Sequence, residues 1–202
     1  MTNYLSLKKL VLISLLAAIG YLIMLIAFPI PMLPGFLTLD FSDLPALIGA
    51  IILGPVAGIL IETIKNILHI LLSSSLTVVP IGELANLLAG SIMICMVCFF
   101  YHRSHSLLSL LTGMICGTLA MTLLMTIANY FLIFPGYALF LGVSEQSLVA
   151  GAQAANRSIH SLLTLVVYGV MPFNLLKGIV LTAIILPVCL RLRRFLDRHA
   201  AA

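Results

Sequence analysis

One apolar block, residues 43–73, has the sequence DLPALIGAIILGPVAGILIETIKNILHILLS. A helix rises about 1.5 Å per residue and needs about 20 apolar residues to cross the hydrocarbon core of a membrane. The block is therefore too long for one crossing and too short for two full ones. Because Gly54-Pro55 interrupts a helix, it predicts a short helix over 43–53 and a longer one over 55–73.

The composition requires that lipid covers most of the surface. Hydrophobic residues make up 62% of the 202 residues and charged residues 8%, whereas a soluble domain carries about 25% charged residues. The other apolar blocks predict helices over 7–28, 81–101, 106–134 and 170–196. We therefore expect an all-α integral membrane protein with six transmembrane helices, built as one domain over residues 1–202.

The charge distribution favours this division of the 43–73 block over a single long tilted helix. With a cytoplasmic N-terminus, Arg103 and the C-terminal arginines 191, 193, 194 and 198 also fall in the cytoplasm, as the positive-inside rule requires. An undivided block would place Arg103 outside. The acidic residues Asp40, Asp43, Glu83 and Glu145 fall on the outer side. Only Arg157, in a predicted outer loop over 135–169 with helical pieces, opposes the trend.

Polar residues inside membrane segments are costly and are candidates for function. Here they gather toward the outer side, three or four positions apart on each of three helices: Lys65 with His69, Glu83 with Asn86, and Asn174 with Lys177. Such spacing puts each pair on one helix face. The faces predict an outward-opening pocket, or alternatively a neutralising contact of Glu83 with Lys65 or Lys177.

Aromatic residues surround two of the polar positions. Tyr130, Phe131, Phe134 and Tyr137 follow Asn129, and Phe173 precedes Asn174. They fit either an interfacial aromatic belt or a stacking wall for a planar ligand. An asparagine amide offers a donor and an acceptor to an imide edge, and a lysine donates to a ring carbonyl. These residue types favour a flat heterocycle of mixed polarity and do not identify it.

Five segments together resemble a known family across essentially the whole chain. They are LTLDFSDLP at 37–45, GPVAG at 54–58 with Glu62 and Lys65-Asn66 after it, GELANLLAG at 82–90, NYF at 129–131 and PFNLLKG at 172–178. The family is the riboflavin-binding S components of energy-coupling factor (ECF) transporters. The resemblance implies a six-helix fold and a vitamin bound at the outer face of a bacterial plasma membrane. It also implies a partner module with one transmembrane scaffold subunit and two ATPases.

The resemblance further implies which residues act. The loop from Pro29 to Asp40 would close over the ligand, and Asn129 and Lys177 match positions that contact the flavin ring. The full set of implied ligand-binding residues is Leu39, Asp40, Lys65, Glu83, Asn86, Asn129, Tyr130, Asn174 and Lys177. The small residues Ser14, Ala17 and Ala18 are similar to the motif that docks on the scaffold subunit. Riboflavin is expected as transported ligand, with no cofactor, metal or catalytic residue.

Three other functions are alternatives. An S component for a different vitamin would share the fold. An ion-coupled secondary transporter would usually show an internal repeat, which is not visible here. An intramembrane enzyme could use His102 with His105, or Lys65 with His69 and Glu83, but the sequence has no H-E-x-x-H or G-x-S-x-G motif. The chain also has no G-x-x-x-x-G-K phosphate loop, so ATP hydrolysis would need partner subunits.

Overall fold

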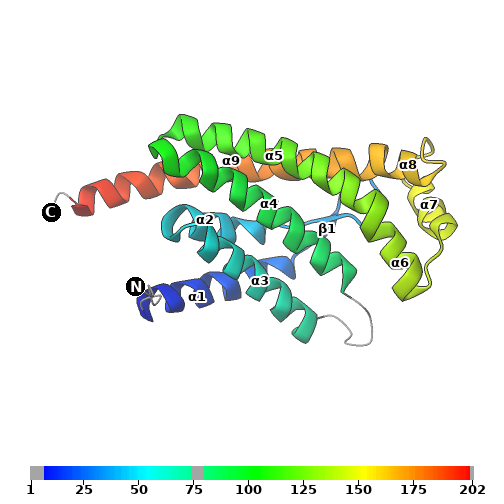
Figure 1. Cartoon of the computed structure of the whole chain (residues 1–202), viewed down its shortest axis with the longest axis horizontal. Helices are drawn as coiled ribbons and strands as arrows, with labels where there is room; N and C mark the ends of the chain where they lie inside the picture. The colour runs from blue at the N-terminus through cyan, green and yellow to red at the C-terminus, as the bar shows by residue number, and fades with distance from the viewer. Residues whose placement is uncertain (1–6, 74–79, 201–202) are drawn as a thin grey trace.

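A computed structural model describes residues 7–73 and 80–200, the side chains of 192–200 excepted. The elements are α1 (Leu7–Met24), β1 (Phe28–Pro29), β2 (Thr38–Leu39), α2 (Asp43–Leu53), α3 (Pro55–Leu72), α4 (Ile81–Ser104), α5 (Leu107–Ala128), η1 (Asn129–Ile133), α6 (Phe134–Leu141), α7 (Glu145–Gln153), α8 (Leu162–Leu165), η2 (Val166–Val170) and α9 (Met171–Ala200). They form an elongated helical bundle (Figure 1). The start of α1 and the end of α9 lie at one end, and α6, α7 and α8 lie at the other.

Among the described residues, five helical segments are long and apolar enough to cross a membrane. They are α1, α3, α4, the continuous run Leu107–Leu141 and the continuous run Leu162–Arg191. The expected all-α membrane class is therefore confirmed. The expected count of six transmembrane helices is not, because α2 has only 11 residues and a crossing needs about 20.

The division of the 43–73 block is confirmed at the predicted residues. α2 ends at Leu53, and Gly54 has a φ of 102°, a left-handed conformation that favours glycine. Pro55 then occupies the first turn of α3, where its missing N–H is tolerated. Gly58 lets the two helices approach closely, since a Cβ at this position would lie 2.5 Å from that of Ala50.

Three predicted helix boundaries are wrong. The first helix ends at Met24 rather than 28, because Phe28–Pro29 pairs with Thr38–Leu39 as an antiparallel ribbon. The fifth continues through η1 to Leu141 rather than ending at 134, and the last begins at Leu162 rather than 170. Pro135 and Pro172 lie in the first turns after η1 and η2, where proline is tolerated, so both helices continue through them. The predicted outer loop over 135–169 shrinks accordingly.

Helix α5 packs between α4 and α9 along most of its length (Figure 1). Gly113 and Gly117 face Val97 and Met93 of α4, and Gly178 of α9 packs directly on Thr118. These small residues bring the backbones close, which is how helices associate in a membrane. Their contacts lie within the chain, so this small-residue pattern serves the bundle's own packing.

Replacing Gly113 with leucine should lower the thermal stability of the purified protein. A Cβ at this position would lie 3.0 Å from Val97 Cα and 3.1 Å from its carbonyl oxygen, and overpacking of this kind costs about 1–3 kcal/mol. The measurement is the unfolding temperature in detergent. Gly151→Leu is the control, because no described atom lies within 4 Å of its added Cβ. Equal effects of the two substitutions would contradict the proposed packing of α5 on α4.

Candidate ligand-binding site

A cavity of about 240 Å³ lies at the end of the bundle away from the chain termini. This volume is close to the lower end of the range of about 300–1,000 Å³ for small-molecule pockets. Its polar and aromatic lining comes from the β2 region, α3, α4, the η1–α6 run and α9: Phe36, Thr38, Asp40, His69, Glu83, Asn86, Asn129, Phe134, Tyr137, Phe173, Asn174 and Lys177. Five segments far apart in the sequence thus converge on one space.

Six of the nine predicted ligand-binding residues line this cavity: Asp40, Glu83, Asn86, Asn129, Asn174 and Lys177. The other three lie around it. Leu39 is buried in β2, and Tyr130 packs on the cluster of Phe134 with Val166 and Val170. Lys65 is fully buried in an ion-pair network behind the wall. A direct ligand contact of these three residues stays a prediction.

Two asparagines present matching amides to the cavity. Asn129 Nδ2 donates to the Met125 carbonyl at 2.8 Å, and Asn174 Nδ2 donates to the Val170 carbonyl at 2.9 Å. An amide has two N–H donors and one carbonyl oxygen. After the backbone bond, each side chain therefore keeps one donor and the oxygen, with no further hydrogen bond to either among the described residues. Both residues are largely buried and both line the cavity, so these groups are available to a ligand there.

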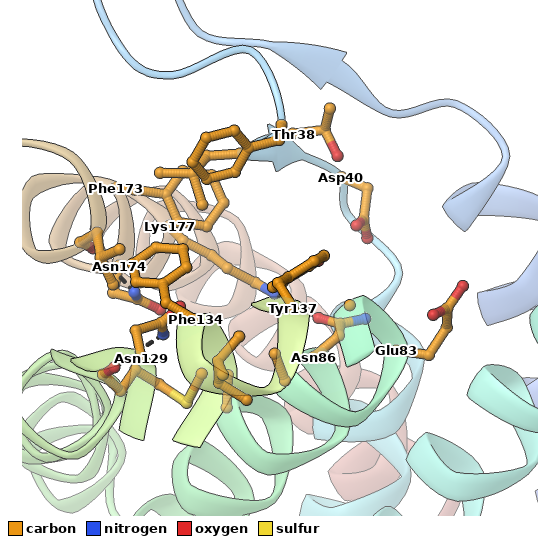
Figure 2. Close-up of a pocket in the computed structure, with 18 of the residues that line it drawn as sticks. Thr38, Asp40, Glu83, Asn86, Asn129, Phe134, Tyr137, Phe173, Asn174 and Lys177 are labelled. Atoms are coloured by element: carbon orange, nitrogen blue, oxygen red, sulfur yellow. Dashed lines mark hydrogen bonds between the residues drawn. The ribbon is translucent and has the colours of Figure 1, made fainter. Parts of the chain in front are cut away.

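The backbone near both amides is π-helical. Asn129 begins η1, and Asn174 follows η2 by four residues. The two π segments contact each other. Single π turns inside α-helices are frequent at functional sites, because the extra residue changes the direction in which side chains point. Here the turns bring both amides into one cavity wall (Figure 2).

Aromatic rings close the same side of the cavity. Phe173, Phe134 and both asparagines lie together in Figure 2, while Asp40 and Glu83 lie on the opposite side. The ring of Phe36, from the loop between β1 and β2, meets that of Phe134 edge-on with centroids 6.2 Å apart. The loop expected to close over the ligand therefore supplies part of the lining through Phe36 and Thr38.

The acidic side of the cavity has a different pairing from the predicted one. Glu83 Oε1 lies 3.0 Å from His69 Nδ1, rather than beside Lys65 or Lys177. His69 is one turn beyond Lys65 on α3, and this places its imidazole at the start of α4, where Glu83 lies. The two lysines are instead engaged deeper in the bundle.

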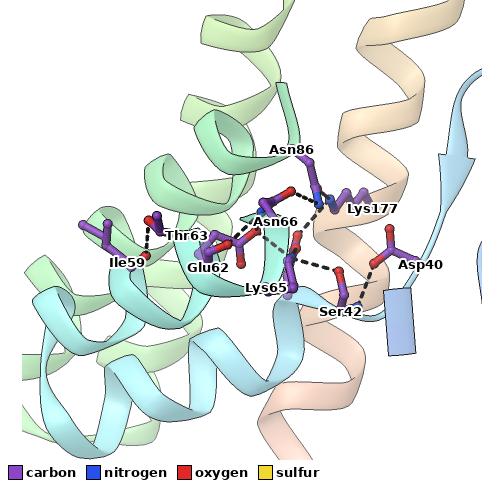
Figure 3. A network of polar contacts seen from close by, with 10 residues as sticks. Asp40, Ser42, Ile59, Glu62, Thr63, Lys65, Asn66, Asn86 and Lys177 are labelled. Carbon is purple, nitrogen blue, oxygen red and sulfur yellow. Dashed lines mark hydrogen bonds and ion pairs between the residues drawn. The ribbon is translucent and has the colours of Figure 1, made fainter. Parts of the chain in front are cut away.

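A buried network of charged groups lies behind the cavity wall (Figure 3). Lys65 Nζ contacts Asp43 Oδ1 at 2.7 Å and Glu62 Oε1 at 2.6 Å, and it donates to Ser42 Oγ at 2.9 Å. All four side chains are at most 3% exposed. Buried charges of this kind are tolerated only when paired. The network joins α3 to the start of α2.

Lys177 links this network to the cavity. Its Nζ lies 2.8 Å from Asp43 Oδ2 and donates to Asn86 Oδ1 at 2.8 Å. Asn86 in turn donates to Asn66 Oδ1 at 3.5 Å. The Lys177 ammonium lines the cavity at one end of this chain of contacts, so the buried charges fix its position.

Comparison with known proteins agrees with this architecture. A model of the family described as "ECF transporter, substrate-specific component" matches residues 8–189. The chain belongs to this family. It is therefore a membrane-embedded transport component and not an enzyme.

Several characterised members are similar over almost the whole chain. The riboflavin transporter FmnP of Bacillus subtilis (strain 168) is 40% identical, with 96% of this chain and 97% of that protein covered. The riboflavin transporter RibU of Staphylococcus aureus (strain TCH60) is 39% identical, with 95% and 93% covered. A solved structure of the S component of a bacterial ECF transporter superposes with a TM-score of 0.73 at 36% identity, covering 94% of this chain and 97% of the other.

The sequence did not identify the buried residues of the site of this S component. Asp43 and Glu62 occur in the segments that carry the family resemblance, but no pattern assigned them to the pocket. One sequence feature could have identified them. An acidic residue inside or next to an apolar helix carries a buried charge, and this charge needs a cation nearby. Met24 lines the cavity without any sequence signal, and Thr38 lines it from the loop that the resemblance predicted to close over the ligand.

The predicted docking residues of the S component divide between two environments. Ser14 and Ala18 are exposed on α1, four positions apart on one face. Ala17 is fully buried in the bundle core. A partner subunit could therefore contact Ser14 and Ala18 directly, whereas Ala17 packs within this chain.

Replacing Lys65 with methionine should strongly destabilise the S component, because it leaves the carboxylates of Asp43 and Glu62 without their shared cation. Removing one partner of a buried ion pair costs about 3–5 kcal/mol. The measurement is again the unfolding temperature in detergent. Adding Glu62→Gln to Lys65→Met removes one of the uncompensated charges and should recover part of the loss. A double variant no more stable than the single one would contradict the network.

Proposed function

We propose that this S component is the high-affinity riboflavin-binding subunit of an ECF-type vitamin importer. The observation that carries the proposal is the pair of buried amides, each with a donor and an acceptor unused, on an aromatic wall beside a lysine. The names of the relatives at 39–40% identity point to the same ligand. Riboflavin is the transported ligand, and the chain acts as a single transmembrane substrate-binding domain.

The flavin ring would lie on the side of Phe134 and Phe173. Its imide edge carries alternating acceptors and donors, which the amides of Asn129 and Asn174 complement. Aromatic rings stack on or pack edge-on against a planar heterocycle. A free N–H of Lys177 reaches a ring carbonyl. These contacts use the free amide groups of both asparagines and a donor of Lys177.

The ribityl chain would lie on the opposite side of the cavity. Its hydroxyl groups are donors, and Asp40 and Glu83 supply carboxylate acceptors there. Thr38 adds a hydroxyl from β2. The two sides therefore match the two halves of an amphipathic ligand, one flat and one polyhydroxylated.

The cavity would open to the extracellular side, with both termini cytoplasmic. Arg103, at the end of α4, and the described start of the chain, with Lys8 and Lys9, lie at the end of the bundle away from the cavity. This distribution is what the positive-inside rule favours. With α2 starting at the depth of the cavity and running beside α3 toward the cytoplasmic side, the chain would count as six membrane helices in a bacterial plasma membrane.

Energy for uptake would come from a partner module of one transmembrane scaffold subunit and two ATPases. The family description supports an assembly of this type, and the chain itself has no phosphate-binding loop. The exposed small residues Ser14 and Ala18 on α1 are the proposed contact with the scaffold subunit, with Ala17 supporting them from the core.

Purified protein should bind riboflavin at about nanomolar Kd, measured by quenching of flavin fluorescence. The double variant Asn129→Ala, Lys177→Ala should weaken binding by about 100-fold or more, because each lost partner of a buried polar group costs about 1–3 kcal/mol. Lys9→Ala, on the exposed part of α1, is the control. Wild-type binding no tighter than about millimolar, or stronger competition by folate, thiamine or biotin, would refute riboflavin as the ligand.

Uptake should require ATP and the partner module. Proteoliposomes that contain the S component with a scaffold subunit and two ATPases are expected to accumulate riboflavin only with ATP, and those with the S component alone are not. Riboflavin accumulation driven by a proton or sodium gradient without ATP would instead identify an ion-coupled secondary transporter.

A further inference from the structure

We propose that Asp43 is a positioning residue that fixes the Lys177 ammonium for the ligand, although Asp43 itself does not line the cavity. The inference rests on the proposed riboflavin-binding function. Asp43 is 2% exposed, and its carboxylate lies between two lysines from different helices, Lys65 on α3 and Lys177 on α9. It therefore acts on the ligand only through Lys177.

The Asp43 carboxylate contacts the two lysines with different oxygens. Oδ1 lies 2.7 Å from Lys65 Nζ, and Oδ2 lies 2.8 Å from Lys177 Nζ. Because Lys65 is also held by Glu62 and Ser42, the Asp43 side chain cannot rotate without breaking a buried ion pair. Oδ2 is thereby fixed in space, and Lys177 Nζ with it.

The Lys177 ammonium is held by the cavity wall on one side and faces the cavity on the other. An ammonium carries three N–H groups. Asn86 Oδ1 accepts one of them at 2.8 Å, and Asp43 Oδ2 holds the ammonium through an ion pair at 2.8 Å. The ammonium also lines the cavity, so an N–H that Asn86 does not use is available to a ligand. These two contacts restrict the flexible four-carbon side chain, which lowers the conformational entropy that ligand binding would otherwise cost.

The cavity wall contains two buried acidic and two buried basic side chains in contact with one another. Asp43 and Glu62 offset Lys65 and Lys177 within the wall, so Lys177 is compensated before any ligand arrives. A ligand on Lys177 need not bring a negative charge, and a carbonyl oxygen suffices. Asp43 accordingly sets a preference for an uncharged acceptor at the Lys177 end of the cavity.

A double-mutant cycle in the full-length protein tests this role. Asp43→Asn keeps the shape of the side chain but offers only one acceptor, so its amide donor faces one of the two lysines. We expect about a 10- to 100-fold loss of riboflavin affinity in the wild-type background. In a Lys177→Met background, the same substitution should change affinity by less than about twofold, because interacting residues are not additive. The absorbance band of bound flavin should shift equally in both single variants.

Glu62→Gln is the matched control. It also removes a buried carboxylate from the network, but Glu62 has no contact with Lys177 among the described residues. It should lower the unfolding temperature and weaken riboflavin binding less than Asp43→Asn does, because Asp43 and Ser42 still hold Lys65 and Asp43 still contacts Lys177. Equal affinity losses in Glu62→Gln and Asp43→Asn, or additive effects of Asp43→Asn and Lys177→Met, would overturn the proposal by showing a merely structural role.

The ligand-free protein separates this inference from the proposed function. If the wild type binds no riboflavin, the proposed ligand is wrong, and the same four proteins are then compared by unfolding temperature. Non-additive unfolding temperatures for Asp43→Asn and Lys177→Met would still support the positioning of Lys177 by Asp43. Additive ones would overturn it.

Discussion

The carboxylate of Asp43 lies between two lysine ammonium groups, and three helices must meet in one register to form these contacts. Lys65 approaches Oδ1 at 2.7 Å from α3, and Lys177 approaches Oδ2 at 2.8 Å from α9. Uncompensated charges inside a membrane protein cost several kcal/mol each, so alternative registers of these helices are strongly disfavoured. Asp43 is also the first residue of α2. Helix α2 is too short to cross a membrane, and the ion pairs hold its first residue at the depth of the cavity.

The fold was predictable where a local rule operates alone. Gly54-Pro55 predicted the division of α2 from α3 at the observed residues, because a left-handed glycine followed by proline both ends one helix and begins the next. The predicted helix end at 134 and helix start at 170, next to Pro135 and Pro172, were wrong. There a π segment precedes the proline and the helix continues, and single-sequence periodicity cannot reveal one extra residue in a helical turn.

The sequence predicted which polar residues of the site share a helix face. It did not predict which residues of different helices contact each other. Spacing of three or four residues identified Glu83 with Asn86 and Asn174 with Lys177 as neighbours on their own helices. It could not indicate that Lys177 would meet Asn86, 91 residues away, or that Glu83 would meet His69. Those contacts depend on how far each helix is rotated and shifted against the next, which only the packed bundle determines.

The placement of charge in the wall has a consequence for a protein that must both hold a ligand and release it. A lysine that relied on the ligand for its counter-charge would be left unpaired at each release, at a cost that opposes delivery. Lys177 is instead paired with Asp43 and hydrogen-bonded to Asn86, both within this chain. The buried amides of Asn129 and Asn174 keep their free groups uncharged. Specificity thus comes from neutral hydrogen-bonding groups with fixed directions, while the charges that fix them remain paired with or without a ligand.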